Sequence, residues 1–268
     1  MIDFHVHTTA SDGQYTPVEI IALAKHKKIT HLAITDHDTI DGIPEALSSV
    51  KNTDISFTTG IEFSAEGNKE LHILGYNFDI QNIKLRNLCN DMALERESRK
   101  YRIIDFLANH GVHISLEDVQ TYAKIAALGR PHFAQAMLAK GYVSTIREAF
   151  DKYLATPAFD KIERKKPSAE EIINTIHQAG GIAVLAHPLL LKLDKNDFEA
   201  LLKKLKNAGL DGIECYYSRH SQNDTEYYLK QAEYLNLRIS AGSDFHGEKI
   251  KPDIRLGIDI NANNISII

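Results

Sequence analysis

The sequence predicts an α/β fold in which parallel strands alternate with helices in a barrel-like arrangement. Short apolar runs typical of buried strands recur along the chain, and segments with helical periodicity stand between several of them. Metal-binding and proton-carrying side chains lie where these strands end, which is where α/β barrels have their active sites. With 268 residues, the chain is long enough for one large domain with an insertion.

Seven apolar runs are expected to form the strands, and three amphipathic runs are expected to form helices between them. The expected strands cover residues 1–7, 31–37, 55–63, 71–76, 181–188, 209–217 and 238–246. The expected helices cover residues 18–28, 169–180 and 197–209, and each ends near glycine or basic residues. Because helices of this kind connect consecutive strands, the strands should run parallel.

The alternation is interrupted in the middle of the chain, where helical runs follow one another without a strand. These runs cover residues 84–111, 115–127, 130–141 and 145–155. The segment 80–166 carries a net charge of +5 and the rest of the chain −10. We therefore expect a barrel built from residues 1–80 and 166–268, with an all-helical insertion at residues 81–165 that attracts anionic substrates.

Composition argues against several classes of protein. No run of about 18 apolar residues is present, so we expect no membrane-spanning helix. We also expect no signal peptide, because no basic patch precedes an apolar run near residue 1. The only cysteines, Cys89 and Cys215, lie far apart and favour a reducing cytoplasm over a disulfide framework. No obligate protein partner is evident from the sequence.

Imidazole and carboxylate side chains occur in six of the expected strand regions. In the HVH stretch, His5 and His7 point to one face because side chains alternate along a strand, and Asp244 and His246 do the same. Burying so many unpaired polar groups would be costly, whereas metal coordination would satisfy them together. The candidate ligands are His5, His7, Asp12, His37, Glu62, His72, His187, Asp244 and His246.

Two further acids flank His37 in the TDHD stretch. Asp36 and Asp38 are expected to accept hydrogen bonds from ligand imidazoles and so orient them. For Asp38, capping of the following helix is an equally good interpretation. A carboxylate such as Glu62 could bridge two ions about 3.5–4 Å apart, as in hydrolytic metal clusters.

These motifs resemble those of the PHP (polymerase and histidinol phosphatase) family. The resemblance rests on HVH at 5–7 with Asp12, GIE at 60–62, TDHD at 35–38, AHP at 186–188 and SDFH at 243–246. It implies a distorted (β/α)7 barrel with two or three ions per chain, Mn²⁺ or else Zn²⁺ or Fe²⁺. The implied ligand sets are His5, His7, Glu62 and Asp244; Asp12, His37 and His246; and Glu62, His72 and His187, with His132 as an alternative ligand in the third.

The insertion resembles that of the YciV/TrpH subgroup of this family. The stretches that carry this likeness are RESRKYR at 96–102 and GRPHF at 129–133. Members of the subgroup remove the 3′-phosphate from 3′,5′-bisphosphonucleotides, and some, called ribonuclease AM, degrade short RNA from its 5′ end. The resemblance therefore implies a metal-dependent phosphoesterase acting on phosphorylated nucleotides or short oligonucleotides.

The motifs also predict catalytic and binding roles for individual residues at the expected site. We place His187, Asp244 and Asp12 in the catalytic centre, with His187 or His220 supplying a proton to the leaving oxygen. Guanidinium groups match phosphate, so a second phosphate, the one not cleaved, is expected to bind in the insertion. The residues expected to bind it are Arg99, Arg102, Arg130 and His132. The competing interpretation is a solvated stripe paired with Glu95 and Glu97.

Two other functions stay open from the sequence. Histidinol-phosphate phosphatase is the nearest rival, although a basic insertion suits that cationic substrate poorly. The other is a metal-stabilised nucleotide-binding module without turnover. Degenerate modules of this kind lack some motif residues, whereas no expected ligand position is substituted here.

Overall fold

The computed structural model describes residues 1–122, 128–162 and 164–267. The expected helix at 115–127 therefore lies partly outside the described residues, from position 123 onward. By its internal packing the chain divides into two compact units. We call residues 1–90 and 166–268 the barrel unit and residues 91–165 the helical unit. The expected boundaries of the insertion, at residues 81 and 165, stay a prediction.

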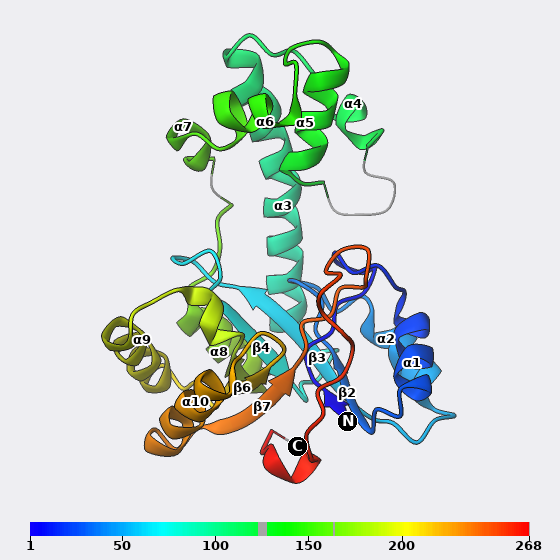
Figure 1. Ribbon diagram of the computed structural model, residues 1–268, viewed down its shortest axis with the longest axis vertical. Coiled ribbons are helices and arrows are strands. Elements are labelled where there is room, and N and C mark those ends of the chain that lie inside the picture. Colours follow the sequence, from blue (N-terminus) through cyan, green and yellow to red (C-terminus); the bar gives the residue numbers. More distant parts are fainter. Residues whose placement is uncertain (123–127, 163, 268) are drawn as a thin grey trace. The chain divides into compact units, whose positions relative to one another are not determined.

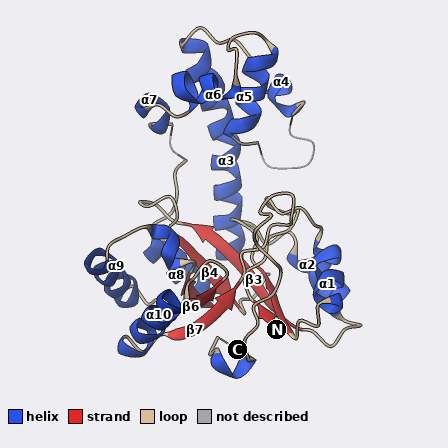
Figure 2. Ribbon diagram, viewed as in Figure 1, coloured by secondary structure: helices blue, strands red, loops and turns tan. Residues whose placement is uncertain are grey.

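The strands of the barrel unit form one seven-stranded sheet in sequence order. It closes nearly into a barrel, because the Phe4 N–H donates to the Ala241 carbonyl at 3.0 Å and Val6 forms a parallel bridge with Phe245. The predicted α/β barrel is thus confirmed (Figures 1 and 2). The strands are β1 (Ile2–Asp3), β2 (His31–Ile34), β3 (Ser56–Ser64), β4 (His72–Tyr76), β5 (Ile182–Leu185), β6 (Gly212–Tyr217) and β7 (Arg238–Gly242).

One strand departs from the expected parallel order. β4 pairs antiparallel with both β3 and β5, whereas the other neighbouring strands pair in parallel. The reason is that β3 and β4 are joined directly, without the crossover helix that parallel strands require. The first residue of β4, His72, consequently pairs with Ser64 at the carboxyl end of β3.

The first strand is much shorter than the seven residues expected. After Asp3 the backbone groups are paired largely with side chains and with isolated partners instead of a regular ladder. The His5 N–H donates to the Asp3 carboxylate at 3.2 Å and the Val6 N–H to the Thr35 hydroxyl at 3.1 Å. Buried polar side chains here replace the strand neighbours that a hydrophobicity pattern assumes.

Helices flank the strands of the barrel unit, with α8, α9 and α10 on one side and α1 and α2 on the other (Figure 1). The apolar core fills the space between helices and strands, with Phe4, Ile34 and Leu74 among its fully buried members. These helices are α1 (Pro17–His26), α2 (Ile43–Val50), α8 (Ala169–Gln178), α9 (Lys195–Asn207) and α10 (Gln222–Tyr234); short 3₁₀ turns cover Pro188–Leu191 and Ala262–Asn264.

The sequence analysis missed α2 and α10. α10 buries only Tyr228 and Ala232, so its hydrophobic periodicity is weak. A different signal was available, because Ser221 and Asp224 form a complete capping box at its start. Capping residues therefore identify this solvent-facing helix better than its apolar residues do.

The helical unit has its own core, built around side chains such as Leu107, Phe133 and Phe159. α3 (Ile83–Asn109) begins in the barrel unit and continues into the helical unit. The others are α4 (Leu116–Gln120), α5 (Arg130–Ala139), α6 (Ile146–Ala149), a π-helical turn (Phe150–Leu154) and α7 (Pro157–Asp160). None of the helices in the described residues has the length and apolarity needed to cross a lipid bilayer.

Candidate metal centre

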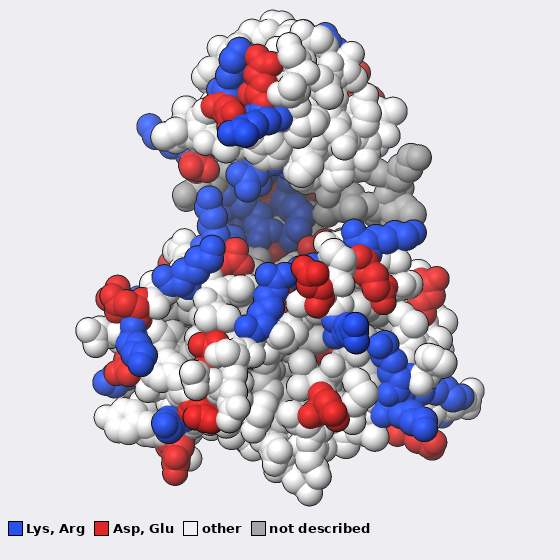
Figure 3. Space-filling view, in the orientation of Figure 1, with Lys and Arg blue, Asp and Glu red and all other residues white. Residues whose placement is uncertain are grey.

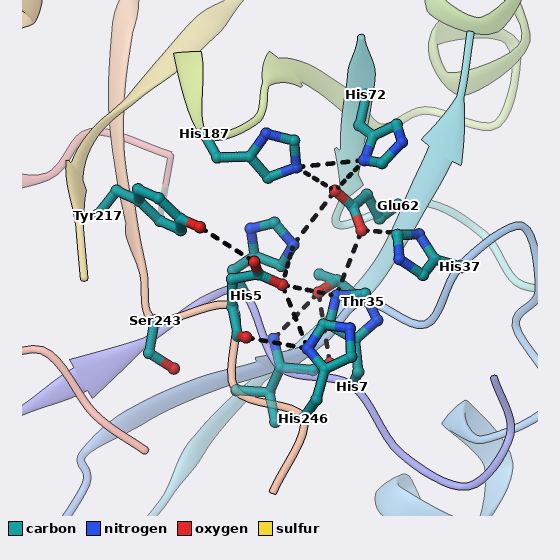
Figure 4. Close-up of polar contacts among 12 residues, drawn as sticks. His5, His7, Thr35, His37, Glu62, His72, His187, Tyr217, Ser243 and His246 are labelled. Carbon is teal, nitrogen blue, oxygen red and sulfur yellow. Dashed lines mark hydrogen bonds and ion pairs between the residues drawn. The ribbon is translucent and has the colours of Figure 1, made fainter. Parts of the chain in front are cut away.

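Nine histidine and carboxylate side chains converge at one end of the barrel unit, and Figure 4 shows the histidines among them around Glu62. Most follow the carboxyl ends of parallel strands, which is where an α/β barrel places its site. His72 instead begins β4, and the antiparallel direction of β4 brings it to the same end. The nine are the predicted ligands His5, His7, Asp12, His37, Glu62, His72, His187, Asp244 and His246.

The carboxylate of Glu62 lies at the centre of this group. Its side chain is fully buried on β3, and imidazole nitrogens of five histidines surround its two oxygens. This places one carboxylate within reach of imidazoles from four other segments of the chain. Oε1 lies 2.8 Å from His72 Nδ1, 2.8 Å from His187 Nε2 and 3.4 Å from His5 Nε2, and Oε2 lies 2.9 Å from His37 Nδ1 and 3.2 Å from His7 Nε2.

Asp12 forms a second focus, on the loop that follows β1. Its Oδ1 lies 3.4 Å from His246 Nε2 and 3.6 Å from His7 Nδ1, and its Oδ2 lies 3.9 Å from His37 Nε2. These four residues form one of the groups whose ligand atoms all lie within 4.8 Å of one another. Three of them, Asp12, His37 and His246, are the set that the family resemblance implies for one ion.

Asp244 presents its two oxygens to different surroundings. Oδ1 lies 3.4 Å from His7 Nε2 and 3.8 Å from His5 Nε2, inside the cluster. Oδ2 instead accepts hydrogen bonds from the Tyr217 hydroxyl at 3.1 Å and from Lys251 Nζ at 2.7 Å. The second oxygen is therefore held in place while the first stays turned toward the imidazoles.

The charges of the cluster are strongly coupled. Burial would raise the pKa of Glu62, but the imidazoles of His37, His72 and His5 hold it well below its usual range. Burial would lower the pKa of His7, but Asp244, Glu62 and Asp12 raise it to about 9. Burial lowers the pKa of His72, which is consistent with a neutral ring. The site thus contains ionised carboxylates beside an imidazole in the neutral form that metals bind.

The donor atoms fit a metal centre. Within the described residues, seven buried side-chain nitrogen and oxygen atoms have no hydrogen-bond partner. Six of these belong to the predicted ligands, and both ring nitrogens of His7 are among them. Orphaned polar atoms in a protein interior are costly, and each neutral imidazole ring can offer one nitrogen lone pair to a cation, as can the Glu62 oxygen. The six are His5 Nε2, His7 Nδ1, His7 Nε2, His37 Nδ1, Glu62 Oε2 and His187 Nδ1.

Backbone strain is also concentrated here. Asp38, His187 and Asp244 have positive φ angles of 59°, 26° and 59°, a region that side chains with a Cβ rarely adopt. Hydrogen bonds fix this geometry: the His187 N–H donates to Glu214 Oε2 at 2.7 Å and the Asp244 N–H to the His5 carbonyl at 2.8 Å. Such conformations cluster at functional sites, where the surrounding structure enforces them.

The acids of the TDHD stretch hold the backbone of the site. Asp36 accepts from the Thr8 N–H and hydroxyl, both at 2.7 Å, and from the Ser11 hydroxyl at 2.6 Å. The expected imidazole contact is therefore wrong for Asp36, which instead orders the loop that carries Asp12. Asp38 accepts from the Ser64 N–H at 2.8 Å.

The helix-capping interpretation of Asp38 is also wrong. The next helix, α2, has Gly42 as its N-cap residue, and no side chain caps it there. The Asp38 N–H donates to the Glu62 carbonyl at 2.9 Å, so this residue ties the segment after β2 to the central strand of the site.

The predicted phosphate-binding residues lie in the helical unit and are described within it. Arg99 is half-buried, its Nε donates to the Ile162 carbonyl at 2.9 Å, and its guanidinium lies over the Phe159 ring. Burial and the nearby guanidinium groups of Arg130, Arg164 and Arg102 lower the pKa of Arg99. Like charges thus gather here, as expected for an anion-binding group.

Two other predicted phosphate-binding residues make contacts that support the fold of the helical unit. Arg102 donates to Glu95 at 3.1 Å, which is the pairing that the competing interpretation expects. His132 Nδ1 accepts the Gly129 N–H at 3.0 Å, so this ring caps the start of α5. That leaves Nε2 of His132 for any contact with a ligand.

His220 is a poor candidate for the proton donor. Its Nδ1 lies 2.9 Å from the Cys215 carbonyl, and a carbonyl can only accept, so Nδ1 carries the proton. Burial lowers the pKa of His220, which leaves Nε2 as an unprotonated acceptor. His187 lies against Glu62, and its catalytic role stays a prediction.

Four buried or partly buried residues at the site were missed by the sequence analysis. Glu214 contacts His5, Asp3 holds the backbone next to Asp244, and Tyr217 and Lys251 bind Asp244 itself. For the two acids a signal was available, because each interrupts an otherwise apolar run: IDFHV for Asp3 and GIECYY for Glu214. An ionisable residue inside a predicted strand should be read as a candidate site residue.

Comparison with known proteins gives consistent results. The PHP domain family matches residues 3–250 of this chain. A 5′-3′ exoribonuclease from Haemophilus influenzae is 34% identical over 246 residues, covering 91% of this chain and 89% of that protein. A 3′,5′-nucleoside bisphosphate phosphatase from Chromobacterium violaceum is 31% identical over 247 residues, covering 91% and 87% respectively. The solved structure of a Bifidobacterium adolescentis protein, assigned as a metal-dependent phosphoesterase, matches with a TM-score of 0.73 at 28% identity, covering 97% and 91% of the two chains.

Cation binding should stabilise the fold. A cation that binds only the native chain stabilises it by about 2.7 kcal/mol at a free concentration of about 100 times its Kd. We expect Mn²⁺ to raise the Tm relative to the EDTA-treated chain, and more at pH 8 than at pH 6. The sign follows because His7, whose pKa is raised to about 9, must lose its proton to bind a cation.

Differential scanning calorimetry checks this, with Mg²⁺ as the control cation. Mg²⁺ prefers oxygen ligands in octahedral geometry and should raise the Tm less than Mn²⁺ at an equal concentration. An unchanged Tm with each of Mn²⁺, Zn²⁺ and Fe²⁺ would contradict a metal centre.

Proposed function

Because the chain belongs to the PHP domain family, we propose that it is a metal-dependent phosphoesterase that removes the 3′-phosphate of 3′,5′-bisphosphonucleotides. As a second activity, we propose degradation of short 5′-phosphorylated RNA from the 5′ end. The first activity is that of the C. violaceum relative by its name, and the second is that of the H. influenzae relative. Histidinol-phosphate phosphatase is less well supported, since both of these relatives are named for nucleotide or RNA substrates.

The observation that carries the proposal is the group of nine side chains around Glu62. Its imidazoles and carboxylates suit Mn²⁺, Zn²⁺ or Fe²⁺, and we propose two or three such ions per chain. One would be held by His5, His7, Glu62 and Asp244, a second by Asp12, His37 and His246, and a third by Glu62, His72 and His187. The members of each set approach one another closely, and Glu62 links the first set to the third.

Ions bound in this way supply a nucleophile at neutral pH and stabilise charge on the phosphoryl oxygens. The protein's part is to hold the ligands ready before substrate arrives. Glu62 draws five imidazoles to one point, and Asp36 orders the loop that carries Asp12. We propose that Asp244 and Asp12 act in the catalytic centre with His187; Lys251 adds a positive charge beside Asp244.

Substrate selection is assigned to the guanidinium groups of the helical unit. We propose that Arg99, Arg102 and Arg130, with His132, bind the phosphate that is not cleaved. The support is that these positive charges gather around Arg99 closely enough to lower its pKa, a cost that a bound phosphate would offset. A substrate with a second phosphate would then bind more tightly than a simple monophosphate ester.

Surface charge favours short substrates over long nucleic acid. The net charge is −5, and the visible face of the barrel unit has acidic and basic side chains interspersed rather than a continuous basic strip (Figure 3). We also propose a cytoplasmic location, because Cys89 and Cys215 are both free thiols buried in the fold.

The substrate assignment predicts an order of preference. The Mn²⁺-loaded protein should have a higher kcat/KM for 3′,5′-bisphosphoadenosine than for histidinol phosphate, and should also shorten a 5′-phosphorylated RNA oligonucleotide. Phosphate release from the two monoester substrates and the length of the RNA on a denaturing gel, measured side by side, check this. A preference for histidinol phosphate would overturn the substrate assignment, and no turnover of any of them would favour a binding module.

The second phosphate site predicts a selective effect on KM. Arg130→Ala should raise the KM for 3′,5′-bisphosphoadenosine about tenfold or more, since a hydrogen bond to a charged group contributes about 1.5–3 kcal/mol. The KM for p-nitrophenyl phosphate, which has no second phosphate, should stay unchanged. Arg147→Ala is the matched control, because Arg147 is 90% exposed in the same unit and pairs with Asp151. Equal losses on both substrates would contradict this role.

A further inference from the structure

Glu214 is a buried carboxylate beside the metal centre that belongs to none of the ligand sets above. It lies on β6 with no exposed surface. Its Oε1 lies 3.1 Å from His5 Nδ1, and its Oε2 accepts the backbone N–H of His187 at 2.7 Å. The close approach depends on Gly242, where a Cβ would lie 2.6 Å from Glu214 Oε1 and 2.2 Å from the Cβ of His5.

The contact with His5 decides which ring nitrogen carries a proton. A carboxylate oxygen accepts, so His5 Nδ1 donates to Glu214. The other nitrogen, Nε2, is then the one that offers a lone pair once it has lost its proton. It is buried without a hydrogen-bond partner and faces Glu62 Oε1 at 3.4 Å. The tautomer that Glu214 selects is therefore the one that a cation needs.

The contact with His187 acts on the backbone. His187 has φ 26° and ψ 59°, and Glu214 accepts its N–H in this strained conformation. In the same conformation His187 Nε2 lies 2.8 Å from Glu62 Oε1. The two oxygens of one carboxylate thus hold two ligands of a single group, which consists of His5, Glu62 and His187.

We infer that Glu214 is a positioning residue for two of the proposed ligand sets, because it fixes the tautomer of His5, in the first set, and the backbone at His187, in the third. This inference rests on the metal centre proposed above and extends it to a residue outside the ligand sets. It assigns Glu214 no contact with substrate. The group formed by His7, Asp12, His37 and His246 does not contain either partner of Glu214, so its cation should be independent of Glu214.

Glu214→Gln tests the inference with little change in shape. Glutamine has one acceptor oxygen, but the two donors, His5 Nδ1–H and the His187 N–H, each need one. When the amide oxygen accepts the His187 N–H, the amide NH₂ group faces His5 and donates to its Nδ1. The His5 proton then lies on Nε2, where it blocks cation binding. We expect the affinity of the position that contains His5 to fall about 10–100-fold, while the cation held by Asp12, His37 and His246 is retained.

Two measurements test the expected loss of cation binding, and neither depends on enzyme activity. Equilibrium dialysis against Mn²⁺, followed by elemental analysis, gives the number of cations bound per chain at each concentration. Long-range ¹⁵N–¹H correlation spectra of the histidine rings show whether Nδ1 of His5 carries a proton in the metal-free chain. The wild type should show a proton on Nδ1 of His5, and Glu214→Gln should show Nδ1 without one.

Asp211→Asn is the matched control, because Asp211 makes the same kind of contacts away from the cluster. It lies 2.7 Å from His177 Nε2 and accepts the N–H of Ala183, on β5, at 2.8 Å. Its amide variant should bind as many cations as the wild type. In a His5→Ala background, adding Glu214→Gln should weaken cation binding no further than twofold if Glu214 acts mainly through His5.

The outcomes separate this inference from the proposed metal centre. A wild type that binds no cation would overturn the centre, while the His5 tautomer would still report on Glu214. A Glu214→Gln chain with wild-type tautomer and cation count would overturn the inference alone, as would an equal loss in Asp211→Asn. If Glu214→Gln does not fold, Glu214→Asp is the second variant, because it retains both acceptor oxygens. Nδ1 of His5 should then stay protonated. A Glu214→Asp chain in which Nδ1 of His5 has no proton would also contradict the inference.

Discussion

The interaction on which the site depends is the buried contact between the Glu62 carboxylate and five imidazoles. A carboxylate with no exposed surface is stable only if positive charge or hydrogen-bond donors surround it, and five imidazoles from four segments meet that need. The same arrangement leaves several ring nitrogens without a hydrogen-bond partner. The contact that satisfies Glu62 therefore creates the demand for cations, which links the electrostatics of the interior to phosphoester chemistry.

The fold brings these groups together through strand direction and through a layer of supporting acids. Parallel strands deliver most ligands from their carboxyl ends, and the reversal of β4 lets His72 join them from an amino end. Behind the ligands, other carboxylates hold the backbone. Asp3 accepts from the Ser243 hydroxyl and N–H, next to Asp244, and Asp36 accepts from Thr8. Burial raises the pKa of Asp3 to about 6 despite these hydrogen bonds, so support of this kind has an electrostatic cost.

Much of this was predictable from the sequence, because the ligands sit in short motifs with strand periodicity. The HVH and SDFH stretches predicted that their histidine and aspartate side chains lie close together in the fold. Most of the strand positions followed from apolar runs. What could not be predicted depends on partners distant in sequence. The extent of β1 was overestimated because the Asp3 and Thr35 side chains replace ladder hydrogen bonds there. Glu214 was missed because its role appears only when His5, more than two hundred residues away, is seen beside it.

The central claim is that this buried cluster is a metal centre that performs hydrolysis. His7 tests it most directly, because both of its ring nitrogens are buried without hydrogen-bond partners and it belongs to two of the ligand groups. The measurement is the bound metal and the turnover of 3′,5′-bisphosphoadenosine by His7→Ala, with circular dichroism as the check on folding. A folded chain that has lost at least one cation, and whose turnover falls by at least about a hundredfold, agrees with the account. Full activity with wild-type metal content would mean that the two histidines of HVH only support the structure, and would contradict it.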